Sequence, residues 1–171
     1  MILVIGYGNS LRQDDGAGLI LAEVIEQACH SRHLPAKRIC VHQLMPELVL
    51  ELAQDEVEVV IFTDTRVAPT PQEASLAVQI SPLIVDTISP SLGHHLTPTT
   101  LLIYAKMLYG KQPPVWIATI PGFQFDHGED FSQSTKYALD TAKTAVANWL
   151  SERISARYPV TEGKNQVGTG I

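Results

Sequence analysis

Two aspartates and a pair of adjacent histidines, far apart in the sequence, are the residues best suited to shared chemistry. Asp15 follows an apolar segment that ends at Gly6, Asp64 ends a second apolar segment, and His94 and His95 stand together in a loop. Carboxylate oxygens and an imidazole nitrogen form a donor set that suits a borderline divalent metal and leaves positions open for substrate ligands. This pattern predicts a site made of both aspartates and one of the histidines.

Such a site requires both aspartates to lie at one edge of a sheet. Residues 2–5 form a continuous apolar run, and residues 57–62 form a mostly apolar one, as expected for strands buried on both faces. If the two strands are parallel, Asp15 and Asp64 share the carboxyl edge, where ligands of open α/β sheets bind. The histidine loop can reach the same edge.

Each of these residues also has an ordinary structural interpretation. Asp14 or Asp15 could cap the helix that follows, and Asp64 could close a turn. The two histidines could be one packed and one solvated side chain. The residue types alone leave these alternatives open.

A second polar cluster, formed by Asp126, His127 and Glu129, is interpreted as a solvated loop, with substrate contact as the alternative. Cys29 and Cys40 are the only cysteines. We expect both to be reduced core residues, because isolated thiols in a cytosolic chain are usually structural.

Strand-like and helix-like segments alternate along the chain. Strands are predicted over residues 2–5, 39–44, 57–64, 76–80 and 115–120, and helices over 17–28, 46–53, 98–108 and 132–156. This order predicts an α/β fold: one three-layer domain in which a twisted, mostly parallel sheet of about five strands lies between helices. Thr97 and Pro98 predict the cap and first turn of one helix, which ends before Gly110. We assign residues 1–158 to the domain and 159–171 to a flexible C-terminal tail.

Charge and hydropathy exclude several classes of partner. The 171 residues include 12 Lys and Arg against 18 Asp and Glu, for a net charge of −6, with no long basic run, which argues against a nucleic-acid partner. No apolar run approaches the roughly 18 to 20 residues that a membrane span needs. The first residues lack the basic start of a signal peptide. We therefore expect a cytoplasmic protein with no membrane or nucleic-acid partner.

The glycine-rich segment after the first strand, Gly6-Tyr7-Gly8-Asn9-Ser10-Leu11, does not predict a nucleotide site. A dinucleotide fingerprint needs a third glycine where Leu11 stands. Asp14 and Asp15 would repel a phosphate, and the lysine of a P-loop is missing.

That segment continues into a specific string, Gly6-x-Gly8-Asn9-x-Leu11-x-x-Asp14-Asp15-Gly16-x-Gly18. Two further segments follow in order, Val60-Ile61-Phe62-Thr63-Asp64 and Ser91-Leu92-Gly93-His94-His95-Leu96-Thr97-Pro98. Together they resemble the nickel–iron hydrogenase maturation proteases over roughly residues 1 to 150. His42-Gln43-Leu44-Met45-Pro46-Glu47-Leu48 is similar to members that serve the bidirectional, NAD(P)-linked hydrogenase of cyanobacteria.

The resemblance implies a fold and an activity. The family has a twisted, largely parallel sheet between helices and removes a C-terminal extension from the hydrogenase large-subunit precursor after nickel insertion. It therefore implies an endopeptidase, aspartic-type by family classification, whose partner is that precursor. By position, the catalytic and metal-contacting residues are Asp15, where relatives often carry Glu, Asp64 and His94, with His95 as the alternative. Asp14 is assigned to loop geometry.

The same residues fit two other functions. A non-catalytic chaperone could use the three ligands to sense the metal of the precursor without cutting it. Peptidyl-tRNA hydrolases share the apolar strand and the glycine–asparagine loop, but they need a basic groove and a histidine soon after Asn9, where this chain has two acids. We expect a monomer with no permanently bound cofactor, in which the nickel of the precursor contacts the site.

Overall fold

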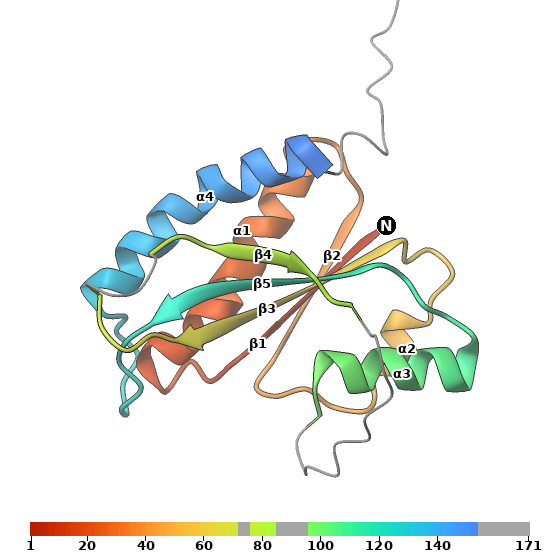
Figure 1. Ribbon diagram of the computed structural model, residues 1–171, viewed down its shortest axis with the longest axis horizontal. Helices are drawn as coiled ribbons and strands as arrows, with labels where there is room; N and C mark the ends of the chain where they lie inside the picture. Colours follow the sequence, from red (N-terminus) through yellow and green to blue (C-terminus); the bar gives the residue numbers. More distant parts are fainter. Residues whose placement is uncertain (72–75, 85–95, 154–171) are drawn as a thin grey trace, which may run out of the picture.

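A single sheet forms the centre of the computed structural model, which describes residues 1–71, 76–84 and 96–153. The strand order is β2-β1-β3-β5-β4, and all neighbours are parallel except β4, which is antiparallel to β5 (Figure 1). The strands are β1 (Ile2–Tyr7), β2 (Ala36–Val41), β3 (Val59–Val67), β4 (Gln79–Pro82) and β5 (Val115–Gly122). The predicted mostly parallel sheet of about five strands is confirmed.

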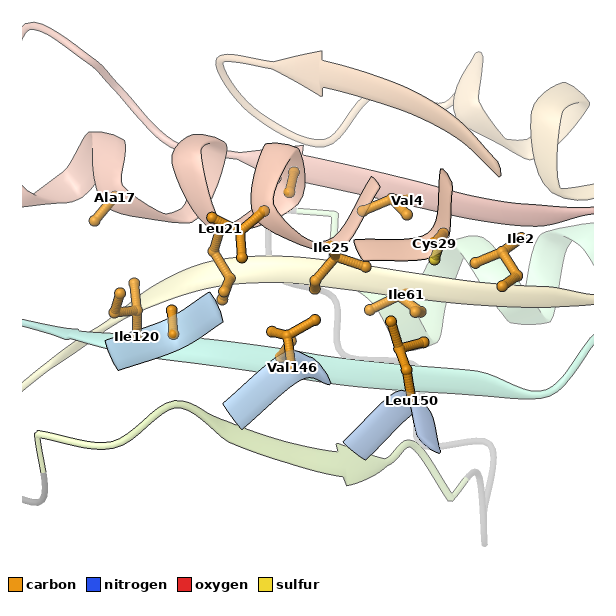
Figure 2. Packing of buried hydrophobic residues seen from close by; sticks show 14 of the residues in the cluster. Ile2, Val4, Ala17, Leu21, Ile25, Cys29, Ile61, Ile120, Val146 and Leu150 are labelled. Carbon is orange, nitrogen blue, oxygen red and sulfur yellow. The ribbon is translucent and has the colours of Figure 1, made fainter. Parts of the chain in front are cut away.

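Helices cover both faces of the sheet and complete three layers. One face carries α1 (Ala17–His30) and α4 (Gln133–Arg153), and the other carries α2 (Leu48–Leu52) and α3 (Pro98–Tyr109) (Figure 1). Figure 2 shows the core on the first face, where side chains of α1 and α4, among them Leu21 and Val146, turn toward the sheet. None of the described helices is long and apolar enough to cross a membrane.

Alternation of side chains along the strands explains why the central ones are apolar throughout. In β1, Val4 packs in the cluster under α1 and α4, whereas Leu3 and Ile5 pack in the cluster under α2 and α3. In β3, Ile61 and Phe62 divide between the same two clusters. The same alternation determines on which side of the sheet the side chain of each later residue of β1 and β3 lies.

Some boundaries differ from those predicted. β2 begins at Ala36, and a 3-10 helix, η1 (Gln13–Gly16), precedes α1. The prediction that the third strand ends at Asp64 is wrong, because β3 continues to Val67 while it pairs with β5. The polar residues after Phe62 hide this extension from a hydropathy pattern.

The described residues do not test every predicted boundary. The two histidines of the predicted histidine loop, the end of the last helix at 154–156 and the tail at 159–171 lie outside them. The division into a domain of 1–158 and a tail therefore stays a prediction.

The two ends of α3 follow the local signals in the sequence. The side chain of Thr97 accepts a hydrogen bond from the backbone N–H of Thr100, at 3.2 Å, and Pro98 occupies the first turn. Gly110 ends the helix in the left-handed conformation, with φ of 67°. Both predicted signals are confirmed.

Replacing Thr97 with alanine removes the cap of α3 and leaves one N–H of its first turn unpaired. We expect Thr97→Ala to lower the free energy of unfolding by about 1 kcal/mol, measured by urea denaturation. Thr99→Ala, in the same turn but not at the cap, is the control and should cost less. Equal losses for the two variants would contradict the capping role.

Candidate active site

The loop after β1 folds back so that Asp15 lies beside the end of that strand. Gly8 has φ of +146°, and a Cβ atom there would lie 2.2 Å from the backbone oxygen of Asp15, so only glycine fits. The backbone N–H of Asn9 donates to Oδ2 of Asp15 at 2.8 Å, and Oδ1 of Asn9 accepts from the N–H of Leu11 at 2.9 Å. These contacts fix the Asp15 carboxylate at the carboxyl edge of the sheet. The N-cap residue of α1 is Gly16, and the carboxylates of Asp14 and Asp15 accept hydrogen bonds from Phe123 and Asn9 instead, so the capping interpretation of the acids is wrong.

The start of α1 packs against β3 at Asp64. A Cβ atom on Gly18 would lie 2.8 Å from the Cα atom of Asp64, so a side chain at position 18 would push the helix away from the strand. Oγ1 of Thr63 donates to the carbonyl of Gly18 at 2.7 Å, and Oγ1 of Thr65 accepts from its N–H at 2.9 Å. Two threonines thus hold the loop that carries Asp15 against the strand that carries Asp64.

Asp64 lies on the opposite side of the sheet from these threonines. The last pair between β1 and β3 joins Gly6 and Thr63, so Asp64 stands beside Tyr7 at the end of β1. Oδ1 of Asp64 accepts from the N–H of Thr65 at 2.7 Å. Asp64 lies within β3, so the interpretation as a turn residue is wrong.

The two carboxylates are close enough for their charges to interact. Burial raises the pKa of Asp64; the neighbouring Tyr7 hydroxyl and the N–H of Thr65 oppose that rise, and the negative charge of Asp15 adds to it, so the pKa stays above the ordinary value. Burial and the charge of Asp64 also raise the pKa of Tyr7, which keeps its hydroxyl a donor. A cation placed between Asp15 and Asp64 would relieve their repulsion.

Asp14 is an anchor and not part of this pair. It is fully buried, and its carboxylate accepts from the N–H of Phe123 at 2.8 Å, the N–H of Gln124 at 3.0 Å, and both the N–H and the hydroxyl of Ser132 at 2.7 Å. Burial would raise the pKa of Asp14, but these hydrogen bonds outweigh it and lower the pKa below the ordinary value. Asp14 therefore joins the opening loop to the segment between β5 and α4, in agreement with its assignment to loop geometry.

That lowered pKa predicts how stability depends on pH. The unfolded carboxyl binds a proton more readily than the folded one, so the contribution of Asp14 is fully present above about pH 4 to 5 and is lost as the pH falls through the folded pKa. We expect Asp14→Asn to lower the free energy of unfolding at pH 7 by roughly 1–3 kcal/mol. Its stability should also fall less steeply in acid than that of the parent.

Urea denaturation between pH 3 and 7 measures both effects. Asp140→Asn, an exposed change on α4, is the matched control and should stay within about 0.5 kcal/mol of the parent. Parallel acid profiles for Asp14→Asn and the parent would contradict the role of Asp14.

The polar loop after β5 lies against the opening loop. The side chains of Asp126, His127 and Glu129 are exposed, as the solvated-loop interpretation predicts. Nδ1 of His127 lies 3.2 Å from the carbonyl oxygen of Leu11, and the Arg12 guanidinium donates to the carbonyl of Phe125 at 3.1 Å. These contacts place the loop next to the candidate site, so substrate contact stays the alternative.

The predicted histidine ligand, His94 or its alternative His95, lies outside the described residues. Leu96, which follows them, packs in the cluster under α2 and α3, on the side of the sheet where Asp64 lies. Figure 1 shows α3 running opposite to β5, so the helix that follows the histidines begins toward the carboxyl edge. Within residues 1–71, 76–84 and 96–153, no three His, Cys, Asp or Glu side chains gather closely enough to hold a metal. The third ligand stays a prediction.

Neither cysteine is placed to attack a substrate at this edge. Cys29 is buried in α1, and burial raises its pKa to about 11. Cys40 is exposed on β2, so the expectation that it belongs to the core is wrong. Its neighbours Ile39 and Val41 pack under α2 and α3, so Cys40 faces the side opposite Asp64.

A separate groove of about 510 Å³ lies between α2 and α3. Its lining is almost wholly apolar, with Glu47 the single charged member of the set Pro46, Glu47, Val49, Leu50, Tyr104, Met107, Leu108 and Tyr109. It therefore lacks the groups that peptide hydrolysis needs, whereas the carboxylate pair supplies them.

Comparison with solved structures identifies relatives of this fold. A nickel–iron hydrogenase maturation protease, HycI, from Thermococcus kodakarensis is 20% identical, with a TM-score of 0.58 over 88% of this chain and 92% of its own. The hydrogenase maturating endopeptidase HybD from E. coli is 16% identical, with a TM-score of 0.56 over the same shares. A hydrogenase 2 maturation peptidase from a Thaumarchaeota archaeon is 21% identical, with a TM-score of 0.53 over 87% of this chain and 97% of its own.

No family model and no curated protein matches the sequence. At these identities the structural matches establish the fold: the chain is built like the hydrogenase maturation proteases along most of its length. The fold implied by the sequence resemblance is confirmed.

Proposed function

We propose that this chain is an endopeptidase that removes the C-terminal extension of a nickel–iron hydrogenase large-subunit precursor after nickel has been inserted. The observation that carries the proposal is the convergence of Asp15 and Asp64 at the carboxyl edge, held there by the glycines and threonines around them. The shared fold with structures named as hydrogenase maturation proteases supports the same activity. The likeness of residues 42–48 to a cyanobacterial type makes the bidirectional hydrogenase the first substrate to test.

Selectivity for the loaded precursor follows from the donor set. Asp15, Asp64 and His94 (or His95) would offer two carboxylates and an imidazole to a nickel ion that cysteines of the precursor already hold. Affinity then depends on the metal, so specificity is the difference between loaded and empty precursor. The raised pKa of Asp64 fits this role, because a nearby cation would compensate the repulsion between the carboxylates.

The peptide bond of the precursor could be hydrolysed at this site by either of two routes. The nickel held by the substrate would polarise the scissile carbonyl or activate a water molecule as a Lewis acid. Alternatively, one carboxylate would take a proton from the attacking water and return it to the leaving amine, the step implied by an aspartic-type classification.

A non-catalytic chaperone that senses the metal would use the same residues, and mass spectrometry separates the two functions. The chain is incubated with nickel-loaded precursor, and the molecular mass of the precursor is then measured. Loss of the C-terminal mass supports the endopeptidase. A stable complex with unchanged precursor mass would replace it with the chaperone.

Alanine at each predicted ligand should stop processing. We expect full-length precursor to accumulate with Asp15→Ala, Asp64→Ala or His94→Ala, with rates at least about 100-fold below the parent, because each change removes a group that touches the substrate-held metal. Gel shift of the precursor over time measures the rate.

Two comparisons test the assignment of these residues. Asp14→Asn should process loaded precursor at temperatures where it remains folded, because Asp14 acts on loop geometry. If Asp14→Asn abolishes processing while Asp15→Ala preserves it, the assignment of the acids is reversed. His95→Ala should have the smaller effect, and a larger effect than His94→Ala would transfer the ligand role to His95.

The isolated chain should carry no tightly bound nickel. The predicted site supplies three ligands, and tight protein-only sites usually complete their shell with further imidazole or thiolate groups. Elemental analysis of protein purified without added metal measures the content. Near-stoichiometric nickel that survives dialysis, and whose removal abolishes cleavage, would make nickel a resident cofactor and contradict this prediction.

A further inference from the structure

Exposed apolar side chains gather on one surface of the molecule, over α2 and α3. Among the described residues, eleven large apolar side chains are exposed, and six of these belong to α3, α2 or the loop before α2. We call this set the α2–α3 patch: Met45, Leu50, Tyr104, Met107, Leu108 and Tyr109. On the opposite face of the sheet, α1 and α4 expose only Ile20 and Tyr137 among their described residues (Figure 1). The patch is therefore a local feature and not a general property of the surface.

The patch is hollowed between its two helices. The groove of 510 Å³ described above is lined by Leu50 of α2 and by four patch residues of α3. Met107 and Leu108 at its border are 71% and 68% exposed. From these exposed fractions the patch presents roughly 600 Å² of surface, which is at the upper end of what a monomer leaves uncovered. A surface of this kind is expected to be covered by a protein partner.

Two charged side chains flank the patch. Glu47 lines the groove at the start of α2. Successive residues of a helix turn by about 100° around its axis, so Lys106 and Leu108 stand on opposite sides of Met107. Glu47 and Lys106 are both exposed, and neither makes an ion pair with any described residue. The patch thus carries an unpaired acid on its α2 side and an unpaired base on its far side.

We propose that the α2–α3 patch is the contact between two copies of this chain related by a twofold axis. Such an axis brings each surface against its own copy, so an acid and a base on opposite flanks meet twice, Glu47 of each copy facing Lys106 of the other. With roughly 600 Å² from each chain, the contact buries about 1,200 Å² in all, the lower bound for a specific interface. The proposal replaces the monomer expected from the sequence and does not depend on the proposed function.

A second copy fits this surface better than a segment of the same chain. The patch supplies both charges that a twofold contact would pair. Residues 154–171, in contrast, follow α4, which lies on the opposite face of the sheet (Figure 1).

The contact leaves the candidate site of each copy open. α3 begins toward the carboxyl edge of the sheet, and its patch residues, 104–109, lie at its other end. A dimer would therefore present two separate pairs of Asp15 and Asp64.

Sedimentation equilibrium of the full chain, at concentrations from about 1 to 200 µM, measures the association. We expect the mass to rise from one chain to two, with a Kd in the micromolar range. Leu108→Glu places a charge in the apolar contact and should raise that Kd at least about 100-fold. Tyr137→Glu, at an exposed position of α4, is the matched control and should leave the Kd unchanged. Both positions are exposed, so the midpoint of thermal unfolding should stay near that of the parent.

Exchange of the two charges tests the twofold pairing itself. Glu47→Lys and Lys106→Glu each bring like charges together in both pairs, and each should weaken the dimer roughly 10-fold. The double variant restores opposite charges, so its Kd should return to within about 3-fold of the parent value. An apolar surface without this pairing would show no such recovery.

A parent chain that stays monomeric at the highest concentration would overturn the proposal. A double variant as weak as the single ones would overturn the twofold arrangement on which it rests. If the parent is monomeric and Leu108→Glu binds the hydrogenase precursor less tightly, the patch belongs to the precursor instead.

Discussion

The carboxylates of Asp15 and Asp64 repel each other, yet the structure holds both at the carboxyl edge of the sheet. The contacts around them are those needed to keep them there. Asp64 is fixed by the pairing of β3 with its neighbours. Asp15 is fixed by a loop that turns back at Gly8, directly after β1. The close approaches at Gly8 and Gly18 leave no space for side chains that would separate loop, helix and strand. The repulsion remains in the folded state, where it adds to the raised pKa of Asp64. A site in which two carboxylates repel each other favours a ligand that brings positive charge.

Buried polar groups around the pair make this edge rigid. Thr63, Thr65 and Asp14 are buried, and each bonds to backbone or hydroxyl groups of a different segment. Within the described parts of the chain, no buried side-chain nitrogen or oxygen lacks a hydrogen-bond partner. Such a network resists relaxation of the two carboxylates away from each other. Selectivity for a metal held by the substrate would then come from a site prepared before the substrate arrives.

Sequence patterns predicted the parts of this arrangement that depend on local helix-end signals or on the burial of a whole strand. Apolar runs gave the buried parallel strands, and Thr97 and Gly110 marked the ends of α3. The extension of β3 beyond Asp64 was missed because it depends on pairing with β5. Asp14 and Asp15 are adjacent and chemically identical, so only their partners distinguish the anchor from the candidate ligand.

The central claim is that the charges of Asp15 and Asp64 recognise a cation carried by the substrate. Its most direct test is the affinity of the Asp15→Asn, Asp64→Asn double variant for nickel-loaded and empty precursor, measured beside the parent. The substitutions keep shape and remove charge. The parent should bind loaded precursor more tightly than empty precursor, and the double variant should lose that preference while it still binds the empty form. A double variant that keeps the full preference of the parent would contradict the claim.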